Sequence, residues 1–516
     1  MPRRPKPKNT LSAGQRAAMY EAEMEEKQRR LRDDSSNADI VPGKQIVDSV
    51  TEKVDDTVGE QGNVKAAKIK MLPKPQAVTV NVDFGVPVGV VKPMHGMCNG
   101  PKSYGADISE LFRDIGVPSV RFDCTDTAIS ACAVDISRIF KDADADPYDP
   151  ENYDFAVTDE YVEAALLTGA KVLLRLGESR DPFSGKTFAR RIDKEILSRV
   201  CVNIIRHYND RWANGFSYGI DCFEVWNFMT DLSVDENLEI YKTISTAIKL
   251  YDESIKVGGM SCQGLGDKTK NMLRFCKKNR VPLEFLSVDV FYNNPFEAAV
   301  EARDLALFAK KIGLPDVGIV VGKWCYAPVL SSKKGDNDLL IRTAEEKRNF
   351  FEAQRSLHGA AFAAAFMLEG SRVEEVCAGY HFDAQPMISP FCSICDRFGS
   401  PEKSFYAFKA YGELYRAGTS VLCEVEEKEG FARSGISALA SVSELGHGYV
   451  MIASFDGCGT VDIRLDGIGD EMLTADVYML DGVKNMELAD SVPLSGMKKR
   501  LVMNVSAYGA ILIKLY

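Results

Sequence analysis

The sequence lacks several features that would assign it to a class directly. Its 13 cysteines include one CxxC, formed by Cys392 and Cys395, and no second pair at the spacing of a zinc site. No uncharged run is long enough to span a bilayer, and no GxGxxG follows a strand-like segment. We interpret the CxxC as small buried residues in a reducing compartment rather than as a redox or metal site. We therefore expect no bound metal, no cofactor and no membrane-spanning segment.

An excess of positive charge is also missing. The 516 residues carry 63 Lys and Arg against 74 Asp and Glu, which gives a formal net charge of -11. Such an acidic chain is not suited to wrapping nucleic acid or to coating an anionic membrane. The first residues, Met1 to Lys6, contain no apolar leader. We expect a soluble, cytoplasmic protein that binds neither nucleic acid nor a membrane.

Residues 1–72 form a tail whose composition differs from the rest of the chain. Aromatic residues are almost absent and charged residues recur, so this segment cannot bury enough apolar surface to offset its ordering entropy. Within it, Ser12–Arg32 has helical composition, with Ser12 as a candidate N-cap. We favour a disordered, partly helical tail over a formed docking helix. If a protein partner binds, the tail is its expected contact.

From about Gly85 the pattern changes to apolar strands that alternate with amphipathic helices. Eight strand-helix units in about 320 residues predict a (β/α)8 TIM barrel over residues 87–418, with a doubly wound open sheet as the alternative. The expected strands are Val88–Met97, Val117–Cys124, Lys171–Leu176, Cys222–Asn227, Ile255–Gly259, Phe285–Tyr292, Val317–Trp324 and Val376–Phe382. The expected helices include Lys194–Trp212, Leu238–Tyr251, Ala298–Lys311, Ala344–Leu368 and Phe405–Tyr415.

From residue 419 to the end at 516 the apolar period becomes two. Short strands separated by turns such as Asp456-Gly457 indicate a C-terminal antiparallel β-sandwich. Residues 73–86 contain the alternating stretch Ala77–Phe84, which we expect to add a strand to this sandwich. The fold class is then α/β, a TIM barrel with a β-sandwich and a disordered tail.

In such a barrel the reactive groups stand at the C-terminal ends of the strands. Flat aromatic faces beside groups that hydrogen-bond to hydroxyls suit a carbohydrate ligand. The residues at these ends that we expect to bind a ligand are His95, Asn99, Arg121, Asp123, Glu178, Glu224, Trp226, Asn227, Asp289, Tyr292, Trp324 and Tyr326.

The barrel segment resembles the β-xylosidase-like barrels of glycoside hydrolase family 39. The stretches that carry the resemblance include Lys92-Pro93-Met94-His95-Gly96, Val120-Arg121-Phe122-Asp123-Cys124, Leu174-Arg175-Leu176-Gly177-Glu178 and Phe223-Glu224-Val225-Trp226-Asn227. Each stretch is weak by itself, whereas their order and spacing together are specific for the fold. The resemblance runs from about Val88 to Tyr415, and the appended sandwich also fits the family.

The resemblance implies a retaining glycosidase with two glutamates, an acid/base after the Asn of strand four and a nucleophile at the end of strand seven. Such carboxyl groups stand roughly 5–5.5 Å apart. This sequence departs from that pattern at both places. Phe228 follows Asn227, with Met229 where a Pro is usual, and Lys323 precedes Trp324. In addition, Asp289 stands where strand six usually carries a His.

Two missing carboxylates predict a catalytically inactive pseudo-glycosidase that serves as a carbohydrate-binding or protein-interaction scaffold. The alternative is an active glycosidase with a non-standard acid pair. The carboxylates near the mouth are Glu178, Glu224, Asp123, Asp126, Asp289 and Asp383. We also hypothesise an ion pair from Lys323 to Asp289 or Glu224. A third interpretation, Lys323 as a Schiff-base nucleophile, is weaker because neighbouring acids would keep its ammonium charged.

Overall fold

The computed structural model describes residues 78–103, 105–123, 133–178, 188–264, 266–327, 343–387, 389, 391–426, 434–457, 459–469, 472–494 and 499–516. The tail of residues 1–72, its predicted helix Ser12–Arg32 and the candidate carboxylate Asp126 lie outside this part of the chain. The barrel and the sandwich belong to one compact unit, Met71–Tyr516.

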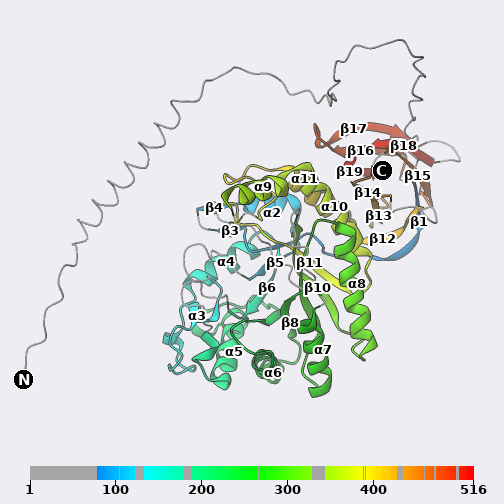
Figure 1. Cartoon of the computed structure of the whole chain (residues 1–516). Coiled ribbons are helices and arrows are strands. Elements are labelled where there is room, and N and C mark those ends of the chain that lie inside the picture. Colours follow the sequence, from blue (N-terminus) through cyan, green and yellow to red (C-terminus); the bar gives the residue numbers. More distant parts are fainter. Residues whose placement is uncertain are drawn as a thin grey trace, which may run out of the picture. The chain divides into compact units, whose positions relative to one another are not determined.

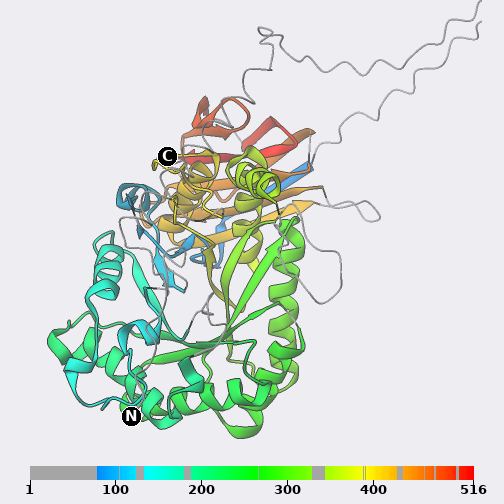
Figure 2. The same cartoon turned by 60° about the vertical axis from the view of Figure 1, so that its left-hand side comes forward.

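Eight parallel strands close into a barrel in the order β10-β11-β2-β5-β6-β7-β8-β9 (Figures 1 and 2). This confirms the predicted TIM barrel and excludes the open sheet. Most strands are near-continuous apolar runs, because helices cover them from outside and side chains fill the interior. The strands are β2 (Gly96–Cys98), β5 (Ser119–Phe122), β6 (Lys171–Leu176), β7 (Cys222–Asn227), β8 (Lys256–Gln263), β9 (Phe285–Tyr292), β10 (Gly318–Tyr326) and β11 (Val376–His381).

The first barrel strand differs from the prediction of Val88–Met97. Strand β1 (Val78–Val90) continues through Val88 and pairs with the sandwich as far as Val90. The prediction from the sequence instead places the start of the barrel at residue 87. The chain then turns at Lys92, whose carbonyl accepts the Met94 amide at 2.8 Å. The alternating valines of β1 therefore belong to the sandwich sheet, and only Gly96–Cys98 pair inside the barrel.

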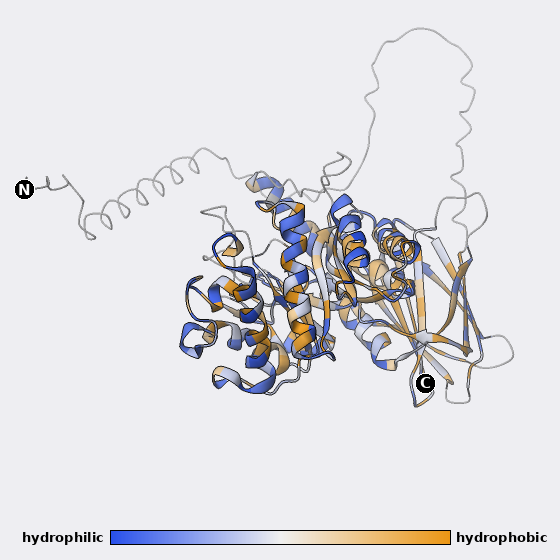
Figure 3. Ribbon diagram, turned by 90° about the horizontal axis from the view of Figure 1, so that it is seen from below, coloured by the Kyte–Doolittle hydropathy of each residue, from blue (hydrophilic) through white to orange (hydrophobic). Residues whose placement is uncertain are grey.

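The helices around the barrel carry both hydropathic colours, as amphipathic helices do (Figure 3). Their limits are α2 (Ser109–Ile115), α3 (Ile136–Ile139), α4 (Ala156–Leu166), α5 (Lys194–Asp210), α6 (Val234–Tyr251), α7 (Asp267–Asn279), α8 (Pro295–Lys311), α9 (Ala344–Arg355), α10 (Leu357–Arg372) and α11 (Lys403–Ala417). Within the described ranges, none of the helices combines the length and apolar character needed to cross a bilayer.

The predicted helix Ala344–Leu368 is two helices, α9 and α10, separated at Ser356. This residue has an extended backbone, and its hydroxyl accepts the Gly359 amide at 3.4 Å, so that it caps α10. Serine at such a position competes with helix continuation because its side chain replaces a backbone hydrogen bond. The break is not evident from the sequence, because the residues before and after Ser356 both have a helix-forming composition.

The C-terminal domain is a nine-stranded sheet in the order β17-β16-β19-β14-β13-β12-β1-β15-β18, which curls into a sandwich around its own apolar core. Strand β1 pairs antiparallel with β12 and parallel with β15. The other strands are β12 (Thr419–Glu426), β13 (Ile436–Val442), β14 (Gly448–Phe455), β15 (Gly459–Asp466), β16 (Thr474–Leu480), β17 (Asn485–Pro493), β18 (Lys499–Val505) and β19 (Tyr508–Leu515). The edge strand β17 is not predicted from the sequence, because it is largely exposed and shows little apolar alternation.

The sandwich packs on the barrel through one shared apolar cluster. Leu439, Met451 and Leu512 of the sandwich belong to the same buried cluster as the barrel core and helices α10 and α11. Helices α10 and α11 therefore each have apolar residues on two sides. One side of each helix packs on the barrel, and the other side packs on the sheet. This packing fixes the barrel strands whose tips carry the candidate site.

Candidate strand-tip site

A network of buried charges joins the C-terminal ends of the barrel strands. Arg121 on β5, Arg175 on β6, Glu224 on β7 and Lys323 on β10 contribute to it, together with Asp289 on β9. Asp123, directly after β5, lies among them and contacts three of the cations. We call these six residues the strand-tip network. Charges removed from water in this way are tolerated only when they are paired with good geometry.

Arg121 and Glu224 form the deepest pair in the strand-tip network, and both side chains are fully buried. The Nε of Arg121 donates to Oε2 of Glu224 at 2.5 Å, and Nη2 donates to Oε1 at 2.7 Å. Burial alone would lower the pKa of Arg121, but the charges of Glu224 and Asp123 outweigh it and raise the pKa well above its usual value. Both carboxylate oxygens of Glu224 are thus engaged by one guanidinium.

Asp123 is the centre of the strand-tip network. Its carboxylate accepts from Nη1 of Arg175 at 2.7 Å, lies 3.6 Å from Nη1 of Arg121 and contacts the ammonium of Lys323. Burial would raise the pKa of Asp123, but the three cations outweigh burial and hold the pKa far below its usual range. Asp123 is therefore a permanent anion in the folded protein.

Lys323 enters the strand-tip network because β10 is irregular at its tip. The pairing of β10 with β9 shifts register between Val321 and Lys323. Gly322, at the shift, lies against Arg121 and Ser287, and an added Cβ would be only 2.5 Å from the Ser287 hydroxyl. The bulge leaves Lys323 over the barrel mouth with 18% of its side chain exposed.

The predicted ion pair between Lys323 and Asp289 is present, with 3.8 Å from Nζ to Oδ2. The nearer partner of Lys323 is Asp123, which the hypothesis did not name. Glu224, the alternative partner in that hypothesis, is bound by Arg121. Asp289 also accepts the Ser261 hydroxyl at 2.9 Å, and burial raises its pKa.

The tip of β7 has a different chemistry. Phe228 is partly buried against the barrel core, and the ammonium of Lys268 lies 4.4 Å from the centre of its ring. The next residue, Met229, is buried, and its amide donates to Oδ1 of Asn237 on α6 at 2.9 Å. Neither side chain offers an oxygen that could carry a proton.

Comparisons with known proteins show which fold this barrel resembles. A family model described as glycosyl hydrolases family 39 matches residues 159–302. A curated β-xylosidase from Geobacillus stearothermophilus is 32% identical over 100 residues, which are 17% of this chain and 19% of that protein. The chain thus spans about a fifth of the length of the curated relative it matches.

Solved structures match over most of the chain. A glucosidase from Croceicoccus marinus aligns with a TM-score of 0.66 at 20% identity, covering 86% of this chain and 99% of that one. A monomeric β-xylosidase from Caulobacter crescentus CB15 aligns with a TM-score of 0.59 at 14% identity, covering 85% and 99%. The chain has a family 39 β-xylosidase-like glycoside hydrolase fold.

The family match includes two of the three positions that depart from the pattern implied by the resemblance and ends before the third. Residues 159–302 contain Phe228 and Asp289, whereas Lys323 lies beyond them. The strand order nevertheless places Lys323 on β10, two positions from β2 in the closed barrel and next to β9. The assignment of Lys323 to the tip of β10 therefore rests on the strand order of the barrel and not on sequence similarity.

Glu178 and Asn227 of this glycoside hydrolase-like barrel tie neighbouring tips together. Oδ1 of Asn227 accepts the Glu178 amide at 3.1 Å. The Glu178 carboxyl group accepts the amide and the hydroxyl of Ser137, each at 2.8 Å. Burial, together with the charge of Asp135, raises the pKa of Glu178 to about 8. Asn99 acts similarly, since its Oδ1 accepts the Asp123 amide at 3.2 Å.

Three of the predicted ligand-binding residues are fully buried and pack against helices around the barrel. His95 lies between Tyr411 and Tyr415 of α11, with ring centroids 5.2 and 4.9 Å away, and burial lowers its pKa to about 3. Trp226 has a φ of 62° and donates from Nε1 to Asn237 at 3.3 Å. Trp324 packs on Phe366 and Phe408.

Two further tyrosines are directed toward neighbouring elements. Tyr292 donates its hydroxyl to Glu301 of α8. Tyr326 lies with its ring centroid 5.4 Å from Phe362 and 6.2 Å from Phe455 of the sandwich. Asp383, a candidate carboxylate, is buried and accepts from Gln385 at 2.8 Å, and burial raises its pKa to about 6.

Sequence reasoning missed some members of the site. Arg175 and Asp135 are not among the predicted site residues. Asp135 accepts a hydrogen bond from Nη2 of Arg175 at 2.5 Å. An arginine inside an otherwise apolar parallel strand is the signal that could have found Arg175, because such a charge needs a buried partner. Among the described residues, no group of three or more His, Cys, Asp or Glu is arranged to hold a metal ion.

Proposed function

We propose that this glycoside hydrolase-like protein is catalytically inactive toward glycosides and that its barrel serves as a carbohydrate-binding or protein-interaction scaffold. The observation that carries the proposal is the ammonium of Lys323, held by Asp123 and Asp289 at the tip of β10. In the retaining mechanism that the resemblance implies, this tip supplies a carboxylate that bonds to the anomeric carbon. A protonated amine has no lone pair for that step.

The tip of β7 supports the same conclusion independently. Phe228, beneath the Lys268 ammonium, cannot protonate a leaving oxygen. Loss of a general acid alone removes a factor of about 10²–10⁴ in rate. Without the nucleophilic carboxylate, the covalent intermediate of the double displacement cannot form. Without the general acid/base, neither of its two steps has a proton donor or acceptor.

The remaining described acids near the mouth are already engaged, which weighs against the alternative of a non-standard acid pair. Glu224 is bound bidentately by Arg121, and Asp123 is surrounded by three cations. Glu178 is buried under the Ser137 hydrogen bonds. The Schiff-base interpretation of Lys323 is also disfavoured, since Asp123 and Asp289 stabilise the charged amine.

The test is a hydrolysis assay with aryl β-xyloside and a panel of other aryl glycosides. The full chain and the variant Asp289→Asn should both release aryl alcohol at the rate of buffer. Hydrolysis by the full chain that is lost in Asp289→Asn would overturn the proposal, because it would show that Asp289 takes part in catalysis. Borohydride trapping with carbonyl compounds should leave Lys323 unmodified.

Sugar binding is tested separately from hydrolysis. A ligand that binds only the folded protein raises its melting temperature in proportion to the logarithm of ligand concentration over the dissociation constant. A shift with xylose or xylo-oligosaccharides that is lost in Asp289→Asn supports a sugar-binding mouth. No shift with any sugar favours the interaction scaffold.

A further inference from the structure

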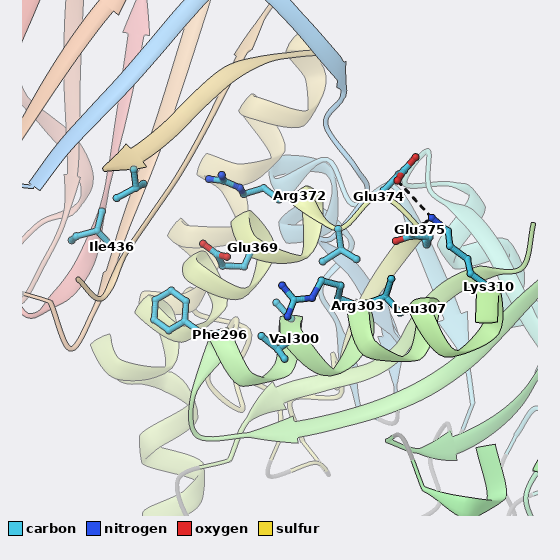
Figure 4. Close-up of a pocket in the computed structure, with 13 residues that line it drawn as sticks. Phe296, Val300, Arg303, Leu307, Lys310, Glu369, Arg372, Glu374, Glu375 and Ile436 are labelled. Atoms are coloured by element: carbon cyan, nitrogen blue, oxygen red, sulfur yellow. Dashed lines mark ion pairs between the residues drawn. The ribbon is translucent and has the colours of Figure 1, made fainter. Parts of the chain in front are cut away.

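A groove follows α8 on the outer side of the barrel, where this helix faces the sandwich. It consists of two adjoining cavities of about 760 and 990 Å³ that share Phe296, Val300 and Arg303. Figure 4 shows the first cavity, with side chains of α8 and of the end of α10 converging and Ile436 of the sandwich opposite. No residue of the strand-tip network lines either cavity. We call the two cavities together the α8 groove.

The middle of the α8 groove is apolar. Val300 and Leu307 of α8 face Val425 and Ile436 at the start of the sandwich, and Leu307 is 53% exposed. Exposed apolar side chains within a bounded groove are typical of an interaction site. From Phe296 to Lys310 the helix rises about 21 Å, which matches about six residues of an extended peptide.

The charge of the α8 groove is strongly unbalanced. Among the described lining residues, seven carboxylates stand against three cations, Arg303, Lys310 and Arg372. These cations are already engaged. Lys310 contacts Glu375 and lies 3.8 Å from Glu374, Arg303 lies 3.8 Å from Asp304, and Arg372 donates to the Ala438 carbonyl at 3.3 Å.

Most acids of the second cavity gather at the N-terminal half of α8. Glu297, Glu301, Asp304 and Asp456 line this end, where Arg303 is the sole cation among the described lining residues. No described cation forms an ion pair with Glu297, which is exposed. An excess of carboxylates over cations along a groove attracts a cationic partner.

Aromatic rings stand at the same acidic end. Tyr292 and Phe455 line the cavity with the four carboxylates, and both are partly exposed. The hydroxyl of Tyr292 is used by Glu301, which leaves the ring as its contact surface. A ring face beside carboxylates stabilises a lysine ammonium or an arginine guanidinium better than a neutral hydroxyl group.

We propose that the α8 groove binds an extended basic segment of a partner protein. Apolar side chains of the segment lie on Val300 and Leu307, and its lysine or arginine side chains lie among the acids beside Tyr292 and Phe455. This inference goes beyond the proposed loss of hydrolysis and does not depend on it, because the groove and the strand-tip network share no residue.

The test uses fluorescence anisotropy with two labelled hexapeptides, one alternating lysine and leucine and the other alternating glutamate and leucine. The full chain should bind the lysine peptide and not the glutamate peptide. The variant Glu297→Lys with Asp304→Lys should bind it about tenfold or more weakly, since two charges at the contact are reversed. Leu307→Asp should weaken it independently of that charge reversal.

The matched control is Glu110→Lys with Glu163→Lys, two acids on the surface between α2 and α4. This pair changes the net charge by the same amount and should alter the affinity by less than about twofold. Melting curves confirm that each variant is folded. Equal weakening by both pairs would show unspecific attraction and overturn the proposal. Binding of neutral xylohexaose that Glu297→Lys with Asp304→Lys abolishes, or no binding of the lysine peptide, would also overturn it.

Discussion

The two strand tips at which the family resemblance implies an acid carry side chains of opposite character. At the end of β7, Phe228 contributes a partly buried aromatic ring, and the ammonium of Lys268 lies over this ring. At β10, Lys323 places a cation beside Asp123 and Asp289. The side chain at β7 carries no charge, whereas the side chain at β10 carries a positive charge that the acids around it hold in place. The tip of β10 is therefore more strongly coupled to the rest of the barrel.

Restoring both acids should have the largest effect. The variant Phe228→Glu with Lys323→Glu provides the two carboxylates of the retaining mechanism, so hydrolysis of aryl β-xyloside should rise at least about 100-fold above that of each single variant. The isosteric control is Phe228→Gln with Lys323→Gln. If the glutamate pair is folded and no faster than the glutamine pair, the tips are not a decayed catalytic site.

Removing the Lys323 charge should have the next largest effect. Lys323→Met leaves Asp123 and Asp289 without their shared cation, and we expect a loss of about 3 kcal/mol in the free energy of unfolding, measured by urea denaturation. Adding Asp289→Asn should restore part of this loss, because Asp123 keeps Arg121 and Arg175, whereas the charge of Asp289, which loses its ion pair with Lys323, is then removed. Additive losses in the double variant would mean that Lys323 and Asp289 are not coupled.

The pH dependence of stability should report Glu178. Its folded pKa of about 8 lies above the ordinary value of 4.5, so the folded state binds the proton more tightly than the unfolded state. The contribution to stability is complete below about pH 4.5 and is lost as the pH rises toward 8. In Glu178→Gln this decline should be absent from denaturation curves measured across that range. An unchanged decline would assign it to another group.

Asp123 should act in the opposite direction. Because its folded pKa is depressed, the stability that it contributes is present above its unfolded pKa of about 4 and is lost as the pH falls below it. The variant Asp123→Asn should be less stable at neutral pH and should lose less stability on acidification. Parallel acid curves for the variant and the full chain would contradict this account.

The smallest effect is expected at β7. Phe228→Leu keeps an apolar residue at a partly buried position but removes the ring under Lys268, so the loss should be about 1 kcal/mol or less. Lys268→Gln should cost a similar or smaller amount. If Phe228→Leu destabilises the protein as much as Lys323→Met, the contrast between the two tips is wrong.

Much of the fold could be predicted because it depends on local patterns. The limits of β6, β7 and β9 agree with the sequence prediction, since each is an apolar run bounded by turns or helices. Phe228 and Lys323 could be placed at strand tips for the same reason. The edge strand β17 and the break at Ser356 could not, because neither changes the apolar pattern.

The direction of individual side chains was less predictable. His95, Trp226 and Trp324 occupy strand ends in the sequence, and their side chains are fully buried against helices around the barrel. A positive φ at Trp226 and the bulge before Lys323 change which face a residue occupies, and alternation along a strand does not reveal either.

The barrel, the sandwich and the presence of Phe228 and Lys323 at the tips of β7 and β10 follow from the sequence, because apolar periodicity and residue identity are properties of the chain. The pairing of Lys323 with Asp123, the pairing of Arg121 with Glu224, and the groove between the acids of α8 and the sandwich are known from the folded structure alone. These relations join residues far apart in the sequence, and the closure of the barrel and the docking of the sandwich set their distances.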